Sequence, residues 1–181
     1  MSSETVQILV DVVSRFDAAV QATPADCWMN PSPCDGWTAV DVVEHVASAG
    51  GGMTAALGGP VPSSFDRIAV TDSWNRVRMA LLNTVESADL STAIPGPVGM
   101  MPAEVIIERL MSVDILVHAW DLATAVGIDA SLDPAAVRRA YDVMEPMDSI
   151  IRAPGVFGPK VAPAEGDDLQ TEFLKFLGRA A

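Results

Sequence analysis

One of the most apolar stretches of the chain, residues 110–120, contains two side chains that resist burial, Asp114 and His118. The two residues lie four positions apart, so a helix places them on one face, one turn above the other. A carboxylate in an apolar helix destabilises the folded state unless it is paired or binds a cation. The stretch therefore predicts a largely buried helix that must provide Asp114 with a partner.

Helical periodicity continues through the rest of the chain. Apolar residues recur every three or four positions in three long segments, residues 4–22, 65–85 and 101–126. Thr38 is a suitable N-cap for a further helix, with Asp41 supporting its first turn. We expect this helix to extend to about residue 57, although Gly50, Gly51 and Gly52 lower its stability and leave a kink or an early end open.

The last third of the chain predicts shorter helices. Gly127 is a good C-terminal cap for the preceding helix, and Asp133 an N-cap for the next one, which Pro146 kinks or splits. Loops are expected at residues 94–100 and 153–166, the first with room for short extended pieces, and a short amphipathic helix at residues 168–177. Because no strand pattern of convincing length occurs, we expect an all-α bundle with additional C-terminal helices, forming a single domain over residues 1–181.

Composition narrows the range of partners. The formal net charge is −13, which argues against binding to nucleic acid or to anionic membrane surfaces. No apolar run is long enough for a membrane span, and the first residues lack the basic and apolar parts of a secretory signal, so we expect a cytoplasmic protein. The only two cysteines, Cys27 and Cys34, are expected to be free thiols with structural roles.

The only other histidine, His45, also lies in an apolar helical segment. Two residues on one helix and a third on another are the pattern of a three-ligand metal site, and four-helix bundles build such sites from inward-facing side chains. Imidazole nitrogen and carboxylate oxygen suit zinc, nickel, iron or manganese. Asp41, one turn before His45, and Asp121, just after His118, are candidates for orienting the two rings. A solvent-facing position or a pairing with an arginine is an equally open alternative for Asp121.

Spacing alone leaves a metal-free alternative open. Asp114 and His118 can form a buried ion pair, with His45 as a hydrogen-bonded core residue, because D-x-x-x-H is a short and unspecific pattern. Other chemistry has little support, since the sequence contains no G-x-S-x-G, P-loop, G-x-G-x-x-G or H-E-x-x-H motif.

Two segments resemble motifs of the DinB/YfiT-like superfamily. Residues 33–38 read P-C-D-G-W-T and are followed by His45, and residues 114–123 read D-I-L-V-H-A-W-D-L-A. The nearest branch contains small metal-binding proteins related to the N-terminal domain of mycothiol-dependent maleylpyruvate isomerase. The resemblance implies a four-helix bundle of up-down-down-up order. It also implies that His45, Asp114 and His118 hold a divalent metal, for which zinc and nickel are the first candidates.

The resemblance also implies a function. We expect a metal-dependent transferase or isomerase that uses a low-molecular-weight thiol such as mycothiol. Asp114 is a departure, because many relatives have histidine at this position and the isomerase has glutamate. The alternative is a non-catalytic metal- or ligand-binding bundle of stress-response type, so the sequence leaves open whether the chain is an enzyme and whether it forms a homodimer.

Overall fold

Four long helices form the main body of the molecule. A computed structural model describes residues 2–97, 99–152 and 157–181. The four helices are α1 (Ser2–Ala22), α2 (Ala39–Ala56), α3 (Val70–Ser87) and α5 (Ser112–Val126). Helix α1 packs against α5 and α3, and α2 packs against α3 and α5, which closes the bundle. The predicted all-α fold is confirmed.

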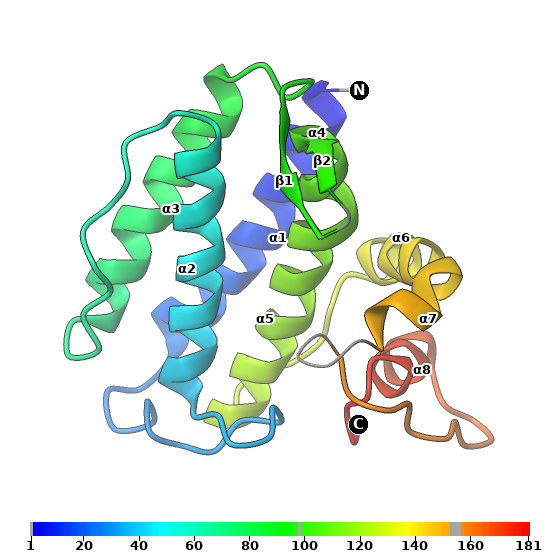
Figure 1. The fold of residues 1–181 in the computed structure, drawn as a ribbon. Helices are drawn as coiled ribbons and strands as arrows, with labels where there is room; N and C mark the ends of the chain where they lie inside the picture. The colour runs from blue at the N-terminus through cyan, green and yellow to red at the C-terminus, as the bar shows by residue number, and fades with distance from the viewer. Residues whose placement is uncertain (1, 98, 153–156) are drawn as a thin grey trace.

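The direction of the helices follows the order that the resemblance implies. In Figure 1, α1 and α5 run in one direction and α2 and α3 in the other. Parallel α2 and α3 require a connection that returns along the bundle, and a helix of 18 residues is about 27 Å long. The connecting residues 57–69 can span roughly 40 Å when extended. This return segment explains why α3 begins at Val70 and not near residue 65.

Helix α2 carries one side of the site and continues through its three glycines to Ala56. At its start, the Asp41 carboxylate accepts a hydrogen bond from the Thr38 backbone N–H at 2.7 Å, as the capping pattern predicts. Gly50 is buried, and a Cβ there would lie 3.1 Å from Val77 Cγ1 of α3. Gly50 therefore lets α2 approach α3 closely, whereas Gly51 and Gly52 have open space around them.

The segment that the periodicity predicts as one helix, residues 101–126, is helical without a gap from Ala103 to Val126 and contains one π-helical turn. A short helix α4 (Ala103–Ile106) and one turn of π-helix, η1 (Ile107–Met111), precede α5. Gly127, with φ of 71°, ends α5 in the left-handed conformation, as predicted. Before α4, β1 (Ala93–Gly96) and β2 (Gly99–Pro102) form an antiparallel hairpin in which Gly96 pairs with Gly99, where the sequence predicts a loop.

The C-terminal helices lie beside α5 (Figure 1). Helix α6 (Pro134–Met144) begins with Asp133, whose side chain accepts from the Ala136 N–H at 2.8 Å. The 3-10 turn η2 (Glu145–Met147) contains Pro146 and leads into α7 (Asp148–Ile151), so this proline splits the helix as predicted. Helix α8 (Leu169–Phe176) packs on α6. Residues 98 and 153–156, which belong to predicted loops, lie outside the described part of the chain.

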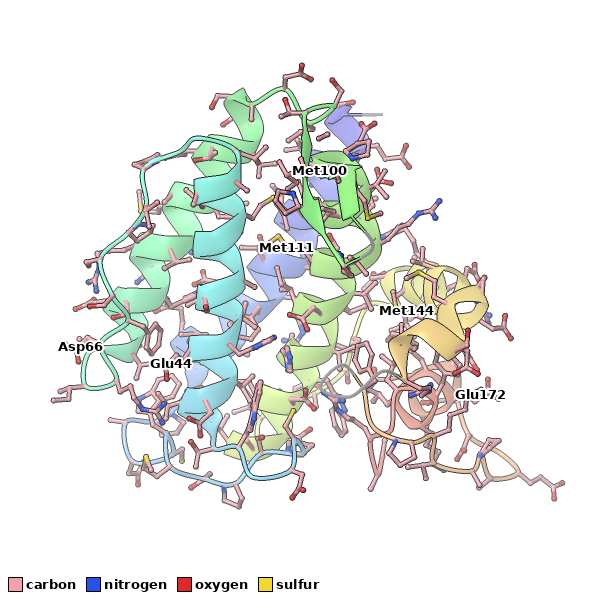
Figure 2. The ribbon with its side chains drawn as sticks, viewed as in Figure 1. Glu44, Asp66, Met100, Met111, Met144 and Glu172 are labelled. Atoms are coloured by element: carbon pink, nitrogen blue, oxygen red, sulfur yellow. The ribbon has the colours of Figure 1, made fainter. Side chains whose placement is uncertain are left out.

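Large aromatic side chains pack in the interior of the bundle, and many acidic side chains lie at its surface. Phe16 and Trp74 are buried in edge-to-face contact with ring centroids 4.8 Å apart, and the Trp74 indole N–H donates to Asp17. Acidic side chains such as Asp66 and Glu172 lie at the outer surface (Figure 2). Among the described residues, no helix is both long enough and apolar enough to cross a membrane.

The glycines of α2 provide a test of this packing. Gly51→Ala should stabilise the protein by about 0.5–1 kcal/mol, because alanine loses less backbone entropy in a helix and the new Cβ meets no other atom within 4 Å. Gly50→Ala should increase the free energy of unfolding by less than Gly51→Ala does, or decrease it, because the new Cβ would lie only 3.1 Å from Val77 Cγ1. Urea unfolding of both variants measures the difference, and equal stabilisation would contradict the close α2–α3 contact.

Candidate metal centre

His45, Asp114 and His118 meet where α2 packs against α5. Asp114 Oδ2 lies 3.2 Å from His45 Nε2, and Asp114 Oδ1 lies 3.3 Å from His118 Nε2. One nitrogen or oxygen atom of each side chain lies within 4.8 Å of the other two. The helical spacing places Asp114 and His118 together, and the packing of α2 adds His45. We call these three residues the triad.

The triad is a partly buried, charged cluster. The His118 side chain is 7% exposed, against 30% for Asp114 and 40% for His45. Burial alone would raise the pKa of Asp114, but hydrogen bonds to both histidines hold it well below its usual value. Burial would lower the pKa of His118, and the Asp114 and Asp121 carboxylates raise it well above its usual value instead. The cluster therefore favours an ionised carboxylate with positive charge beside it.

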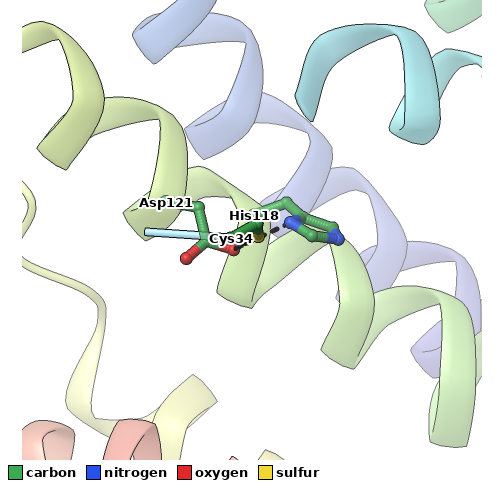
Figure 3. A group of neighbouring side chains, drawn as sticks. All are labelled: Cys34, His118 and Asp121. Atoms are coloured by element: carbon green, nitrogen blue, oxygen red, sulfur yellow. Dashed lines mark hydrogen bonds and ion pairs between the residues drawn. The ribbon is translucent and has the colours of Figure 1, made fainter. Parts of the chain in front are cut away.

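The Asp121 carboxylate contacts the His118 ring at Nδ1, the ring nitrogen that does not face Asp114. Its Oδ2 lies 2.8 Å from His118 Nδ1, and its side chain is fully buried (Figure 3). Arg179, near the end of the chain, donates to both oxygens of Asp121 at 2.8 and 3.1 Å. Burial would raise the pKa of Asp121, but hydrogen bonds from His118 and Arg179 lower it. An ionised Asp121 accepts the Nδ1–H of His118 and so directs Nε2 towards Asp114, where Nε2 can bind a metal once it has lost its proton.

Two residues of the loop before α2 also reach the centre. Cys34, expected to be structural, lies with its Sγ 3.3 Å from Asp121 Oδ2 and 3.4 Å from Arg179 Nη2. The Trp37 ring stacks on His118 with centroids 5.7 Å apart and an angle of 19° between the planes, and it also contacts the ring of His45. Both residues belong to the P-C-D-G-W segment, which was the available sequence signal. Arg179 lies outside both motif segments, so no such signal pointed to it.

Asp41 does not orient His45, so this prediction is wrong in the described structure. Its Oδ2 accepts from Thr38, and its Oδ1 pairs with Arg67 at 2.8 Å. These hydrogen bonds, that from Thr38 first, lower the pKa of Asp41. The reason is its position in the first turn of α2, from which a short side chain reaches back to the N-cap.

The donor set of the triad fits a divalent metal. It offers two imidazole nitrogens and a carboxylate oxygen within 4.8 Å of one another, and these are ligand types that zinc and similar divalent metals bind. A second group of metal-binding residue types, Cys34, His118 and Asp121, lies nearby. There the Arg179 guanidinium already pairs with Asp121 and contacts the sulfur, so a cation would meet positive charge. The triad is the better site.

A polar cavity of about 680 Å³ opens on the triad. Its walls include all three triad side chains together with Cys34, Trp37 and Arg179. The triad therefore borders a space large enough for a small molecule.

Comparisons with known proteins agree on one family. Residues 9–123 match the family model described as the mycothiol maleylpyruvate isomerase N-terminal domain. Two curated relatives are uncharacterized proteins of Mycobacterium tuberculosis, MT0763 of strain CDC 1551 and Rv0738 of strain H37Rv. Each is 30% identical over 171 residues, which is 91% of this chain and 91% of the relative.

One solved structure shares the fold. It is the crystal structure of a histidine-to-alanine mutant of mycothiol-dependent maleylpyruvate isomerase. The match has a TM-score of 0.58 and 15% sequence identity, and it covers 77% of this chain and 67% of the isomerase chain. At this identity the comparison supports the fold alone.

The buried Asp121–Arg179 pair predicts a large loss of stability when it is broken. Asp121→Ala leaves Arg179 and His118 Nδ1 without their acceptor and should destabilise the protein by about 3–5 kcal/mol. The control Arg138→Ala removes an exposed pair with Asp142 and should change the free energy of unfolding by less than about 0.5 kcal/mol. Urea unfolding measures both, and similar values would contradict the role of the C-terminal arginine.

Proposed function

The chain belongs to the mycothiol maleylpyruvate isomerase N-terminal domain family, and from this premise we propose that it is a metal-dependent thiol transferase or isomerase. The triad His45, Asp114 and His118 would hold a divalent metal, with zinc and nickel as the first candidates, and the thiol would be mycothiol or a similar low-molecular-weight thiol. The observation that carries the proposal is the Asp114 carboxylate placed 3.2 and 3.3 Å from the Nε2 atoms of two histidines.

The surrounding residues prepare the triad for this role. Asp121 accepts from His118 Nδ1 and so presents the Nε2 lone pair, the arrangement in which histidine binds metals. Arg179 keeps Asp121 ionised and in place. Trp37 covers the two rings and restricts their rotation. His118 would therefore be the best-fixed ligand, and the more exposed His45 the most adjustable one.

The reaction that we propose depends on a coordination position that the triad would leave free on a bound metal. Three protein ligands leave a coordination position for a further molecule. A bound metal lowers the pKa of a coordinated thiol or water, which supplies a nucleophile near neutral pH. The residues of the chain would position the thiol in the polar cavity beside the triad. This arrangement supports catalysis over a purely structural metal, for which a fourth protein ligand would close the site.

Elemental analysis of the purified protein tests the ligands. Wild type should contain about one divalent metal per chain, and His118→Ala and Asp114→Ala should lose it, because two ligands do not retain the metal. Asp121→Asn should keep the triad but bind the metal about 10–100-fold more weakly, since His118 loses its orienting carboxylate.

A neighbouring acidic residue provides the control. Glu44 adjoins His45 but pairs with Arg67 at the surface, so Glu44→Gln should retain the wild-type metal content. Equal metal content in wild type, His118→Ala and Asp114→Ala would overturn the assignment of the triad.

Thermal unfolding tests the thiol. Mycothiol should raise the melting temperature of the metal-loaded protein and leave the chelator-treated protein unchanged, because ligands that bind only the native state stabilise it. The same shift with and without metal would place the thiol away from the triad. No shift in either state would favour the non-catalytic metal-binding alternative.

A further inference from the structure

A second cavity lies on the other side of the triad and differs from the first in chemistry. It has a volume of about 380 Å³ and is bounded by α2, the β1–β2 hairpin, the η1–α5 segment and the C-terminal helices. Met111 and Met144, labelled in Figure 2, lie on opposite walls. His45 and Asp114 border both cavities, so the two spaces meet at the triad. We call this second space the apolar cavity.

Small side chains on α2 create the room. Ala49, Gly52 and Ala56 follow His45 along the face of the helix that borders the cavity. A Cβ at Gly52 would meet no atom within 4 Å, so the space above this glycine is free. The opposite walls are formed by large apolar side chains such as Ile94 and Leu110.

Charge is confined to one end of the apolar cavity. Among the described residues that line it, His45 and Asp114 are the only titratable ones, and none is lysine or arginine. An anionic ligand would lose its hydration without gaining a cationic partner in the protein walls, and the Asp114 carboxylate would repel it. An uncharged apolar molecule has neither penalty and gains from removal of apolar surface from water.

We propose that the apolar cavity binds an uncharged, apolar small molecule, which is the second substrate beside the thiol. The proposal rests on the proposed function for its reaction partner, but the chemistry of the cavity stands on its own walls. A ligand in this cavity would present one end at His45 and Asp114, opposite the polar cavity assigned to the thiol. The division explains how two unlike molecules reach one centre without competing for the same space.

A matched pair of fluorescent probes tests the selectivity. N-phenyl-1-naphthylamine is uncharged, and 1-anilinonaphthalene-8-sulfonate has the same rings with an added sulfonate. In the chelator-treated full-length protein, where no metal charge contributes, the uncharged probe should bind at least about tenfold more tightly, equivalent to about 1.4 kcal/mol. Equal or tighter binding of the sulfonate would overturn the proposal.

A matched pair of substitutions tests the location. Gly52→Leu extends a side chain into the apolar cavity and should weaken binding of N-phenyl-1-naphthylamine at least about tenfold. Gly51→Leu lies on the same helix turn outside the cavity lining and should bind the probe like wild type. Ala56→Leu fills the same space one turn later and serves as a second plug. Unchanged binding in both plugged variants, with circular dichroism spectra like that of wild type, would exclude this cavity.

Two further measurements separate this inference from the proposed function. His118→Ala should lose the metal but keep the probe, because His118 does not line the apolar cavity. If His118→Ala lost probe binding as well as the metal, the apolar cavity would not be a binding space separate from the metal centre. Mycothiol should leave N-phenyl-1-naphthylamine bound in the metal-loaded protein, and full displacement would show that the cavity is not a second-substrate site. Wild-type protein that takes up neither zinc nor nickel and still binds the probe would refute the proposed function and leave the selectivity of the cavity intact.

Discussion

The structure depends on the ionised carboxylate of Asp114, placed within an otherwise apolar helix. A partly buried carboxylate is tolerated only with charge compensation, and two histidine rings approach it from two helices. This requirement fixes how α2 lies on α5, because His45 reaches Asp114 only when their faces are aligned. The buried valines around His45 and His118 then hold that alignment. Packing and electrostatics thus support the same arrangement.

A chain of alternating charge extends from this point to the end of the sequence. His118 links Asp114 to Asp121, and Arg179 closes the series from the segment after α8. Each member satisfies a hydrogen-bonding group of the next, which is the condition under which a buried polar network stabilises a fold. The C-terminal helices consequently contribute to the centre, since they position the arginine that orients Asp121.

Two cavities of different polarity border the triad. A polar space bordered by Cys34 and Arg179 and an apolar space bordered by the small residues of α2 meet at His45 and Asp114. On α2 the small residues Ala49, Gly52 and Ala56 leave the apolar space unfilled beside the charged cluster. Under the proposed function this separation would serve a hydrophilic thiol and an apolar partner, because each molecule would meet walls of matching polarity.

The sequence by itself determined the helices and the pairing of two of the three triad residues. The 3.6-residue period marked the bundle, Thr38 and Gly127 marked helix ends, and four-residue spacing placed Asp114 beside His118. Such features are local, so they can be predicted from neighbouring residues. The tertiary structure alone decided that His45 faces Asp114, that Asp41 serves the N-cap and not the ring, and that Arg179 reaches Asp121. These contacts join residues far apart in the chain, and they arise only when packing of the apolar faces sets the rotation of each helix.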